Sequence, residues 1–190
     1  MPTLVLLNGP PASGKSTLAR RLVETRPLTL NLDIDVIRGL LGSWLDHAGD
    51  AGLAARALAS AMASTHLGRG HDVVVPQFLA RVEFIDELQR IAVGAGARFV
   101  EIALVLGRDD ALRAFDRRRA APGDQTHVDA AALVDRLAEP DPVGAMYDLF
   151  AEALALRPTA KCVAVEIGDI EGTLERVRAA IEFSVEQQSS

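Results

Sequence analysis

The residues with the clearest chemical use lie near the start of the chain, in the stretch GPPASGKS at positions 9–16. Its spacing is G-x-x-x-x-G-K-[ST], and it stands between an apolar run at 3–8 and an amphipathic helical pattern at 16–25. The backbone N–H groups of such a loop converge on one point, and the positive end of the following helix dipole adds to them. The stretch therefore predicts a cage for the phosphate oxygens of a nucleoside triphosphate.

The residue types in this loop have distinct expected uses. Gly14 lets the backbone approach a phosphate closely, Lys15 can bridge the β- and γ-phosphates, and the Ser16 hydroxyl is placed to ligate Mg²⁺. ATP and Mg²⁺ are the expected cofactors. The nucleotide-binding set that the motif predicts is Gly9, Ala12, Ser13, Gly14, Lys15, Ser16 and Thr17.

A pair of carboxylates follows in the stretch LNLDIDVIRGLL at 30–41. Asp33 and Asp35 come at the end of a weak strand pattern at 28–33, and the carboxyl ends of parallel strands gather ligand-binding groups. One of the two carboxylates is expected to face the γ-phosphate. An aspartate here can also cap the helix that starts near Ile34, and both uses stay open.

An arginine-rich stretch, GRDDALRAFDRRRAAPGD, covers positions 107–124. Arg113 and Arg117 are four residues apart and share a helical face, so both are expected to reach the cleft, while Arg118 is expected to point elsewhere. The alternative is a solvated helix face on which these arginines pair with the aspartates of the same stretch.

With GPPASGKST, LDIDVIR and the arginine cluster, the chain resembles the P-loop small-molecule and polynucleotide kinases. That group includes adenylate-kinase-like folds, chloramphenicol phosphotransferase, zeta-type toxins and the kinase half of polynucleotide kinase. The resemblance loosely covers the whole chain. It implies a mobile lid at about 107–127 and acceptor-binding helices at about 36–70.

The same resemblance implies roles for individual residues. Asp35 accepts the proton of the acceptor hydroxyl, with Asp33 as the competing base or a magnesium ligand. Arg38 anchors the substrate, and Arg119 is the lid arginine that joins Lys15 in catalysis. A carboxylate base fits the chemistry, because phosphoryl transfer needs mainly positioning and charge stabilisation.

The third predicted strand departs from the pattern of these kinases. Many of them end it with an aspartate that helps to hold magnesium, whereas this chain has Pro76 and Gln77 there. Gln77 can hydrogen-bond a substrate hydroxyl but adds no charge, so magnesium must rely on Ser16, Asp33 and the phosphates. Arg81 is a further candidate for substrate contact, with a plain surface position as the alternative.

The elements that must position these residues alternate along the chain. Buried strand patterns occupy 3–8, 72–76, 98–106 and 161–167, with the weaker one at 28–33. Helical patterns occupy 16–25, 34–46, 50–69, 80–95, 109–120, 128–138, 141–156 and 170–187. The alternation predicts an α/β protein with a three-layer P-loop NTPase fold: a five-stranded parallel sheet with helices on both faces and a helical lid. A length of 190 residues suits a single domain, 1–190, and the tail at 186–190 is expected to fray.

The composition limits the possible binding partners and the location of the protein. A net charge of −6 gives no broad field for a phosphate backbone, so nucleic acid is a disfavoured partner. No stretch approaches the roughly 18 apolar residues of a membrane span, and a cytoplasmic location is expected. Cys162, the only cysteine, lies in the apolar run KCVAVEI and is expected to be buried. The oligomeric state stays open.

The expected activity is ATP-dependent transfer of the γ-phosphate to a hydroxyl of a small molecule, such as a metabolite, sugar, antibiotic or nucleotide. One alternative is a polynucleotide 5′-hydroxyl kinase. Another, of a different class, is an ATP-binding switch that hydrolyses slowly and signals through ordering of the lid.

Overall fold

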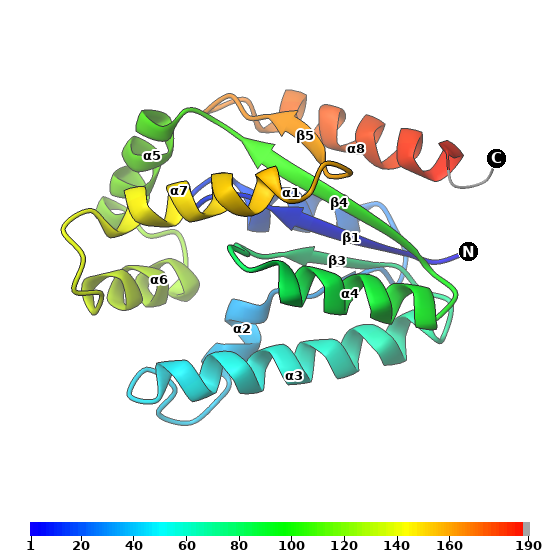
Figure 1. Cartoon of the computed structure of the whole chain (residues 1–190), viewed down its shortest axis with the longest axis horizontal. Coiled ribbons are helices and arrows are strands. Elements are labelled where there is room, and N and C mark those ends of the chain that lie inside the picture. Colours follow the sequence, from blue (N-terminus) through cyan, green and yellow to red (C-terminus); the bar gives the residue numbers. More distant parts are fainter. Residues whose placement is uncertain (188–190) are drawn as a thin grey trace.

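Five parallel strands form one sheet at the centre of the computed structural model, which describes residues 1–187 (Figure 1). The strands are β1 (Thr3–Asn8), β2 (Leu30–Asn31), β3 (Val73–Pro76), β4 (Arg98–Val105) and β5 (Lys161–Ala164), and their order is β2-β3-β1-β4-β5. In the middle strand, Leu4 lies beside Val73 of β3 and beside Phe99 of β4. All six residues of β1 are buried, because helices cover both faces of this part of the sheet.

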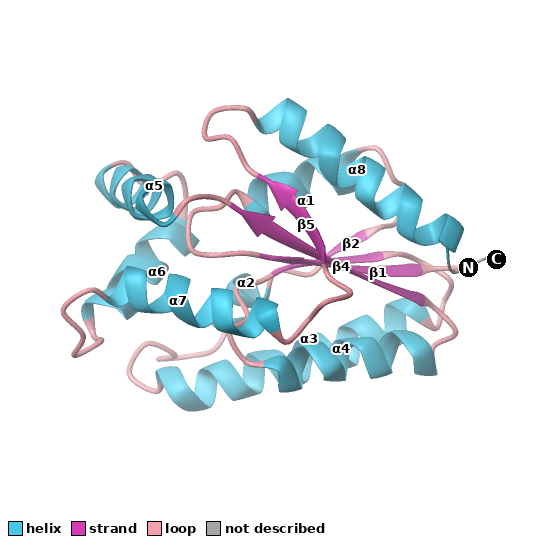
Figure 2. Cartoon of the chain, turned by 45° about the horizontal axis from the view of Figure 1, so that its top comes forward, coloured by secondary structure: helices cyan, strands magenta, loops and turns pink. Residues whose placement is uncertain are grey.

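Eight helices surround the sheet in the described part of the chain. They are α1 (Lys15–Glu24), α2 (Ile34–Gly39), α3 (Ala48–Leu67), α4 (Val82–Gly94), α5 (Arg108–Ala120), α6 (Gln125–Asp135), α7 (Pro142–Ala155) and α8 (Ile170–Gln187). Figure 2 shows the sheet between α1 and α8 on one face and α3 and α4 on the other. Leu4 and Leu6 of β1 pack toward α3 and α4, and Val5 and Leu7 pack toward α1 and α8. The predicted α/β class, with helices on both faces of a five-stranded parallel sheet, is confirmed.

A second, smaller group of helices stands apart from these layers. In Figure 1, α5 and α6 lie beyond the carboxyl ends of the strands, and α7 returns from them toward the sheet. Phe115 of α5, Val134 of α6 and Val143 of α7 form a small core of their own. The lid predicted at about 107–127 corresponds to α5 and the start of α6 within this group.

Some element boundaries differ from the sequence prediction. The helix expected at 34–46 ends at Gly39, and residues 40–47 form turns in which Ser43 has a φ of 50°. Glycines at 39 and 42 weaken a helix at this point, because glycine loses the most backbone freedom on ordering. The sixth helix begins at 125 instead of 128, because the side chain of Asp124 caps it by accepting a hydrogen bond from the His127 N–H.

The last strand also differs from the prediction. It ends at Ala164 instead of 167 and forms the edge of the sheet. Only Val163 of its four residues is buried, and Cys162 is exposed. The prediction that Cys162 is buried was therefore wrong, because side chains alternate along a strand and only one face of this edge strand is covered.

Two further expectations concern the ends and surface of the molecule. Within the described residues no helix is long and apolar enough to cross a membrane. The tail expected to fray overlaps the end of α8 at 186–187, and its last three residues lie outside the described part of the chain.

Candidate active site

The loop between β1 and α1 has the shape of a phosphate cage. Gly14 has a φ of 89°, a backbone conformation that favours glycine. A Cβ added at Gly9 would lie 2.7 Å from the Ser13 Oγ and 3.0 Å from the Leu104 Cβ, so a side chain does not fit there. Both glycines of the motif are thus explained by local geometry, and the start of α1 is open to an anion.

Lys15 folds back onto this loop. Its Nζ donates hydrogen bonds to the carbonyl oxygens of Gly9 at 2.9 Å and Pro10 at 2.8 Å, and to the Ser13 Oγ at 3.4 Å. Loss of water contact lowers the pKa of Lys15 to about 7, and the positive charge of Arg118 acts in the same direction. A cation whose hydrogen-bond acceptors are all neutral is well suited to receive phosphate oxygens, so this lysine fits a nucleotide.

Asp33 serves two local purposes. Its Oδ1 accepts a hydrogen bond of 3.0 Å from the Asp35 N–H and so caps α2, while its Oδ2 accepts one of 3.1 Å from the Ser16 Oγ. Burial and the nearby charge of Asp35 raise the pKa of Asp33. A carboxylate and a hydroxyl in contact are hard oxygen ligands of the kind that Mg²⁺ prefers. No three His, Cys, Asp or Glu side chains gather as a metal site in the described residues, so phosphate oxygens would have to complete the coordination.

Asp35 lies in the first turn of α2 and is held by Arg38 of the same helix. The Arg38 Nη1 is 2.9 Å from the Asp35 Oδ1, and the guanidinium carbon lies 4.8 Å from the ring centroid of Trp44. The Arg38 side chain is only 14% exposed, and its buried Nε has no hydrogen-bond partner in the structure. Asp33, Asp35 and Arg38 line one cavity together with Lys15 and Ser16.

The arginines of α5 are arranged differently from the prediction. Arg118, which was expected to point away, lines the cavity. Arg113 pairs with Asp110 at 2.7 Å on the exposed side of α5, and Arg117 is exposed. Arg119, the expected lid arginine, is half exposed and pairs with Asp135 of α6 at 2.8 Å. The predicted orientation of Arg113, Arg117 and Arg118 was therefore wrong.

The buried residues of α5 explain this orientation. Ala111 and Phe115 form its inward face, and Arg118 follows Phe115 by three residues, which keeps it on that face. The spacing of the apolar residues Ala111 and Phe115 is the sequence signal that could have placed Arg118 on the inward face of the helix. Loss of water contact lowers the pKa of Arg118, and the charges of Asp35 and Asp124 act in the opposite direction.

Two predicted substrate contacts have different outcomes. Gln77, just after β3, lines the cavity, and its buried Oε1 has no hydrogen-bond partner in the structure. Arg81, just before α4, is exposed and does not line the cavity. Its role in substrate binding therefore has no support from the position of its side chain.

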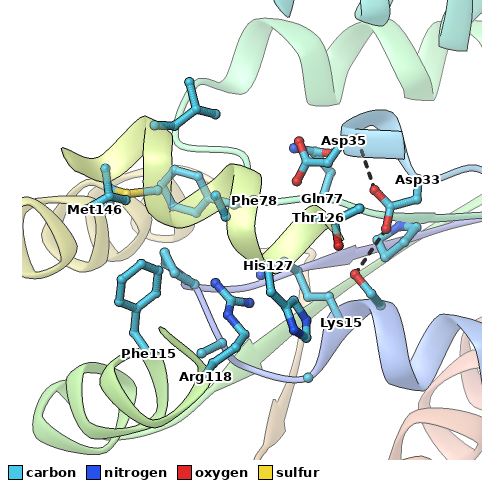
Figure 3. A pocket seen from close by; sticks show the side chains of 18 of the residues that line it. Lys15, Asp33, Asp35, Gln77, Phe78, Phe115, Arg118, Thr126, His127 and Met146 are labelled. Atoms are coloured by element: carbon cyan, nitrogen blue, oxygen red, sulfur yellow. Dashed lines mark hydrogen bonds between the residues drawn. The ribbon is translucent and has the colours of Figure 1, made fainter. Parts of the chain in front are cut away.

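The cavity has a volume of about 530 Å³ and contains residues that the sequence did not single out (Figure 3). Arg56 from α3 and His127 from α6 contribute to its polar part, while Phe78, Phe115 and Met146 contribute apolar side chains. Burial and the charge of Arg118 lower the pKa of His127. These residues lie on five separate segments, so no local pattern in the sequence could have grouped them.

A direct contact joins the two sides of the cavity. Arg136, just after α6, donates a hydrogen bond to the carbonyl oxygen of Leu45 and pairs with Asp46 at 3.4 Å. The turns at 40–47 therefore touch the end of α6. Residues from both predicted segments line the cavity, such as Arg38 and Arg56 from 36–70 and Arg118 from 107–127.

The G-x-x-x-x-G-K-S loop between β1 and α1 and the strand order β2-β3-β1-β4-β5 define a P-loop protein. A family model described as an AAA domain matches residues 4–142, and the chain belongs to this family. No curated protein matches the sequence significantly.

Solved structures share the fold at low sequence identity. A gluconokinase from Sinorhizobium meliloti is 14% identical with a TM-score of 0.63, over 99% of this chain and 96% of the gluconokinase. The Deinococcus radiodurans tunicamycin resistance protein is 14% identical with a TM-score of 0.58, over 96% of both chains. A chain of the Pnkp1/Rnl/Hen1 RNA repair complex is 15% identical with a TM-score of 0.65, over 84% of this chain and 47% of that one. The chain thus has the fold of P-loop kinases.

Proposed function

We propose that this protein is an ATP-dependent kinase that transfers the γ-phosphate to a hydroxyl of a small molecule, with Asp35 as general base. The observation that carries the proposal is that Lys15 of the phosphate loop and Asp35 of α2 line the same cavity. A group suited to bind phosphate and a group that can accept a proton therefore face the same cavity. The fold that the chain shares with the gluconokinase supports the same kind of activity.

The side chains divide the work of the reaction as follows. Lys15 and the loop N–H groups bind the phosphates, and Ser16 and Asp33 would hold Mg²⁺, which neutralises phosphate charge when bound. Asp35 takes the proton of the acceptor hydroxyl. The oxygen of that hydroxyl bonds to the γ-phosphorus as the bond between the γ-phosphorus and the leaving oxygen of ADP breaks. The pair with Arg38 at 2.9 Å fixes the carboxylate in position.

Asp35 is a better candidate for the base than Asp33. Both oxygens of Asp33 already accept hydrogen bonds, one from the Ser16 hydroxyl and one from the backbone N–H at the start of α2. Moving the proton of an acceptor to Asp33 would weaken both of these bonds. The Asp35 side chain is 36% exposed and lines the cavity, and among the described residues its carboxylate pairs only with Arg38.

Arg118 takes the place that the sequence analysis gave to Arg119. It lines the cavity in the field of Asp35 and beside Lys15, where a guanidinium can neutralise charge on the phosphoryl group in transfer. Arg119 holds α5 to α6 through Asp135 instead. We therefore assign the role of the lid arginine to Arg118.

Two variants test the proposal. Asp35→Asn keeps the size of the side chain but loses the base, and it is expected to lower kcat by about 10²-fold to 10⁴-fold with little change in the affinity for ATP. Lys15→Ala is expected to lower both kcat and the affinity for ATP, because it removes a phosphate contact. The exposed Asp50 at the start of α3 provides a control, and Asp50→Asn should behave like the parent.

The assay follows ADP release and product mass with a panel of sugars, nucleosides, hydroxylated antibiotics and a 5′-hydroxyl oligonucleotide. Binding of ATP without transfer to any acceptor, together with unchanged hydrolysis in Asp35→Asn, would favour the switch alternative. Transfer to the oligonucleotide alone, with binding that weakens steeply as salt increases, would favour the polynucleotide kinase alternative.

A further inference from the structure

The cavity of the proposed active site has two unlike ends (Figure 3). In this view Lys15, Asp33, Asp35 and Gln77 lie toward one end, and Phe78, Phe115 and Met146 lie toward the other. Leu133, Val134 and Leu137 also line the cavity, and they add to its apolar surface. Arg118 stands between the two groups in Figure 3.

The apolar end is built into the fold. Phe115 and Val134 are buried and pack with Val143, and Met146 packs against this cluster from α7. Three helices therefore hold the wall in place through their own core, without needing a ligand to assemble it. A preformed apolar wall beside a few polar groups is typical of sites for small organic molecules.

This wall limits the chemistry of the acceptor. A polyol or sugar acid placed there would lose water without gaining hydrogen bonds, which costs free energy for each polar group. A polynucleotide would have to place its next phosphate against phenylalanine, leucine or methionine side chains. An aromatic or branched aliphatic group gains from the same contact in proportion to the apolar area that it buries.

The polar end offers hydrogen bonds that the protein does not satisfy itself. The Gln77 Oε1 and the Arg38 Nε are buried and unpartnered, and both side chains line the cavity. A hydroxyl donates and accepts, so it can satisfy the Gln77 amide in either of its two orientations. The position of Gln77 just after β3 places such a hydroxyl at the same end of the cavity as Asp35.

The geometry points to an amphipathic alcohol as the acceptor: a molecule with one hydroxyl-bearing polar end and an aromatic or branched apolar body. Its hydroxyl meets Asp35 and Gln77, and its apolar body lies against Phe78, Phe115 and Met146. This inference rests on the proposed kinase function and adds the substrate class. It separates this chain from kinases whose acceptor is polar throughout.

Matched pairs of alcohols test the inference. Glycerol and 3-phenoxypropane-1,2-diol share a diol and differ by one phenyl ether group, and 3-(1-naphthoxy)propane-1,2-diol extends the series. With ATP and Mg²⁺, the aryl members are expected to be phosphorylated with a kcat/KM higher than that of glycerol by about ten-fold or more. D-gluconate and a dinucleotide with a free 5′-hydroxyl serve as polar comparisons. Ligand-observed NMR in the presence of ADP measures binding independently of transfer.

Two leucine variants localise the effect. The side chain of Leu137 lines the cavity and is 51% exposed, so Leu137→Asp places a charge at the apolar end with little cost to folding. Leu149 on α7 is 49% exposed and does not line the cavity, so Leu149→Asp is its matched control. The advantage of the aryl alcohols is expected to fall by about ten-fold in the first variant and to persist in the second.

The outcomes separate the substrate class from the kinase activity. Equal or better transfer to glycerol or gluconate overturns the substrate class and leaves the kinase activity standing. Preferential binding of the aryl alcohols without transfer to any acceptor supports the amphipathic site and removes the kinase function. Absence of preferential aryl binding overturns the inference whatever the transfer assay gives. A higher KM for ATP in Leu137→Asp, with the aryl advantage intact, also overturns it, because the apolar end then holds the nucleotide base.

Discussion

Lys15 shows how the phosphate loop prepares a cation for its ligand. Within the described residues, its Nζ donates only to oxygens of its own loop, those of Gly9, Pro10 and Ser13. Desolvation is the largest cause of its lowered pKa, and the charge of Arg118 adds to it. Two cations near one cavity repel each other until an anion lies between them. Binding of a triphosphate therefore relieves an electrostatic cost that the fold carries.

This arrangement predicts proton uptake when a nucleotide binds. Lys15 has a pKa of about 7 in the free protein, so at pH 8 it is about nine-tenths neutral, and the phosphates will draw a proton onto it. Titration calorimetry at pH 8 in buffers of different ionisation enthalpy should detect uptake of nearly one proton per nucleotide. Uptake should fall toward zero at pH 6, where the lysine is already charged.

Lys15→Arg supplies the control, because a guanidinium stays protonated throughout this range. Equal uptake by the parent and Lys15→Arg at pH 8 would show that another group takes the proton.

The same lysine also affects the stability of the fold. The unfolded chain keeps its proton up to the ordinary value of 10.5, while the folded chain releases it near 7. Its contribution to the free energy of unfolding therefore rises with pH between these values.

At the scale of single elements, the rotation of α5 about its axis decides which arginine enters the active site. Ala111 and Phe115 anchor its inward face, and Arg118 extends that face toward the cavity. Arg119 is one position further along the helix, which turns it by about 100° to the pair with Asp135. Neighbouring arginines on one helix therefore have different surroundings: Arg118 lines the cavity, and Arg119 pairs with Asp135.

The comparison of Arg118→Ala with Arg119→Ala tests this assignment. Arg118→Ala is expected to lower kcat by about 10²-fold or more, because the phosphoryl group in transfer loses a positive charge that faces it. Arg119→Ala removes a surface ion pair and should change kcat by less than about three-fold. Steady-state kinetics of both variants at saturating ATP measure the difference. The reverse order would restore Arg119 as the lid arginine.

Local patterns predicted most elements of this fold, and the failures have local causes. The loop between β1 and α1 was located from the sequence because its motif needs only adjacent residues, and its binding of phosphate stays a prediction. The turns at 40–47 were missed because the apolar pattern continues past the point where the helix ends. The exposure of Cys162 was missed because an apolar run does not distinguish an edge strand from a buried strand. The cavity wall formed by Phe78, Phe115 and Met146 was missed because only the tertiary fold brings those segments together.

The position of α7 in the whole molecule affects the cavity, because Met146 on this helix forms part of the cavity wall. At one end of α7, Asp141 pairs with Arg108 of α5 at 2.7 Å. At the other end, just beyond the helix, Arg157 reaches both the sheet and a covering helix. Its Nε donates to Glu101 of β4 at 2.9 Å, and its Nη1 is 2.7 Å from Asp86 of α4. Arg157 thus ties the end of α7 to both the sheet and α4.

Glu101 makes this connection costly to break. Its side chain is 4% exposed, and burial raises its pKa while the Arg157 charge opposes that rise. Arg157→Ala leaves a buried carboxylate without its partner, and it is expected to lower the free energy of unfolding by about 3 kcal/mol or more. Denaturant unfolding followed by circular dichroism measures the loss. Arg113→Ala breaks an exposed pair with Asp110 at 2.7 Å and should cost less than about 1 kcal/mol.

The pH dependence of this loss distinguishes a buried charge from lost packing. In Arg157→Ala, the pKa of Glu101 in the folded protein should rise further above its unfolded value, because burial is no longer opposed by the guanidinium. A carboxyl with a raised pKa contributes stability that is present at low pH and is lost as the pH rises through the folded pKa. The difference in unfolding free energy between Arg157→Ala and the parent should therefore be smaller at pH 5 than at pH 8. Replacing both partners, as Arg157→Met with Glu101→Leu, should recover part of the loss and remove its pH dependence. A loss that is the same at both pH values would mean that Arg157 stabilises the molecule through its alkyl chain, and that the ion pair with β4 adds nothing to the attachment of α7.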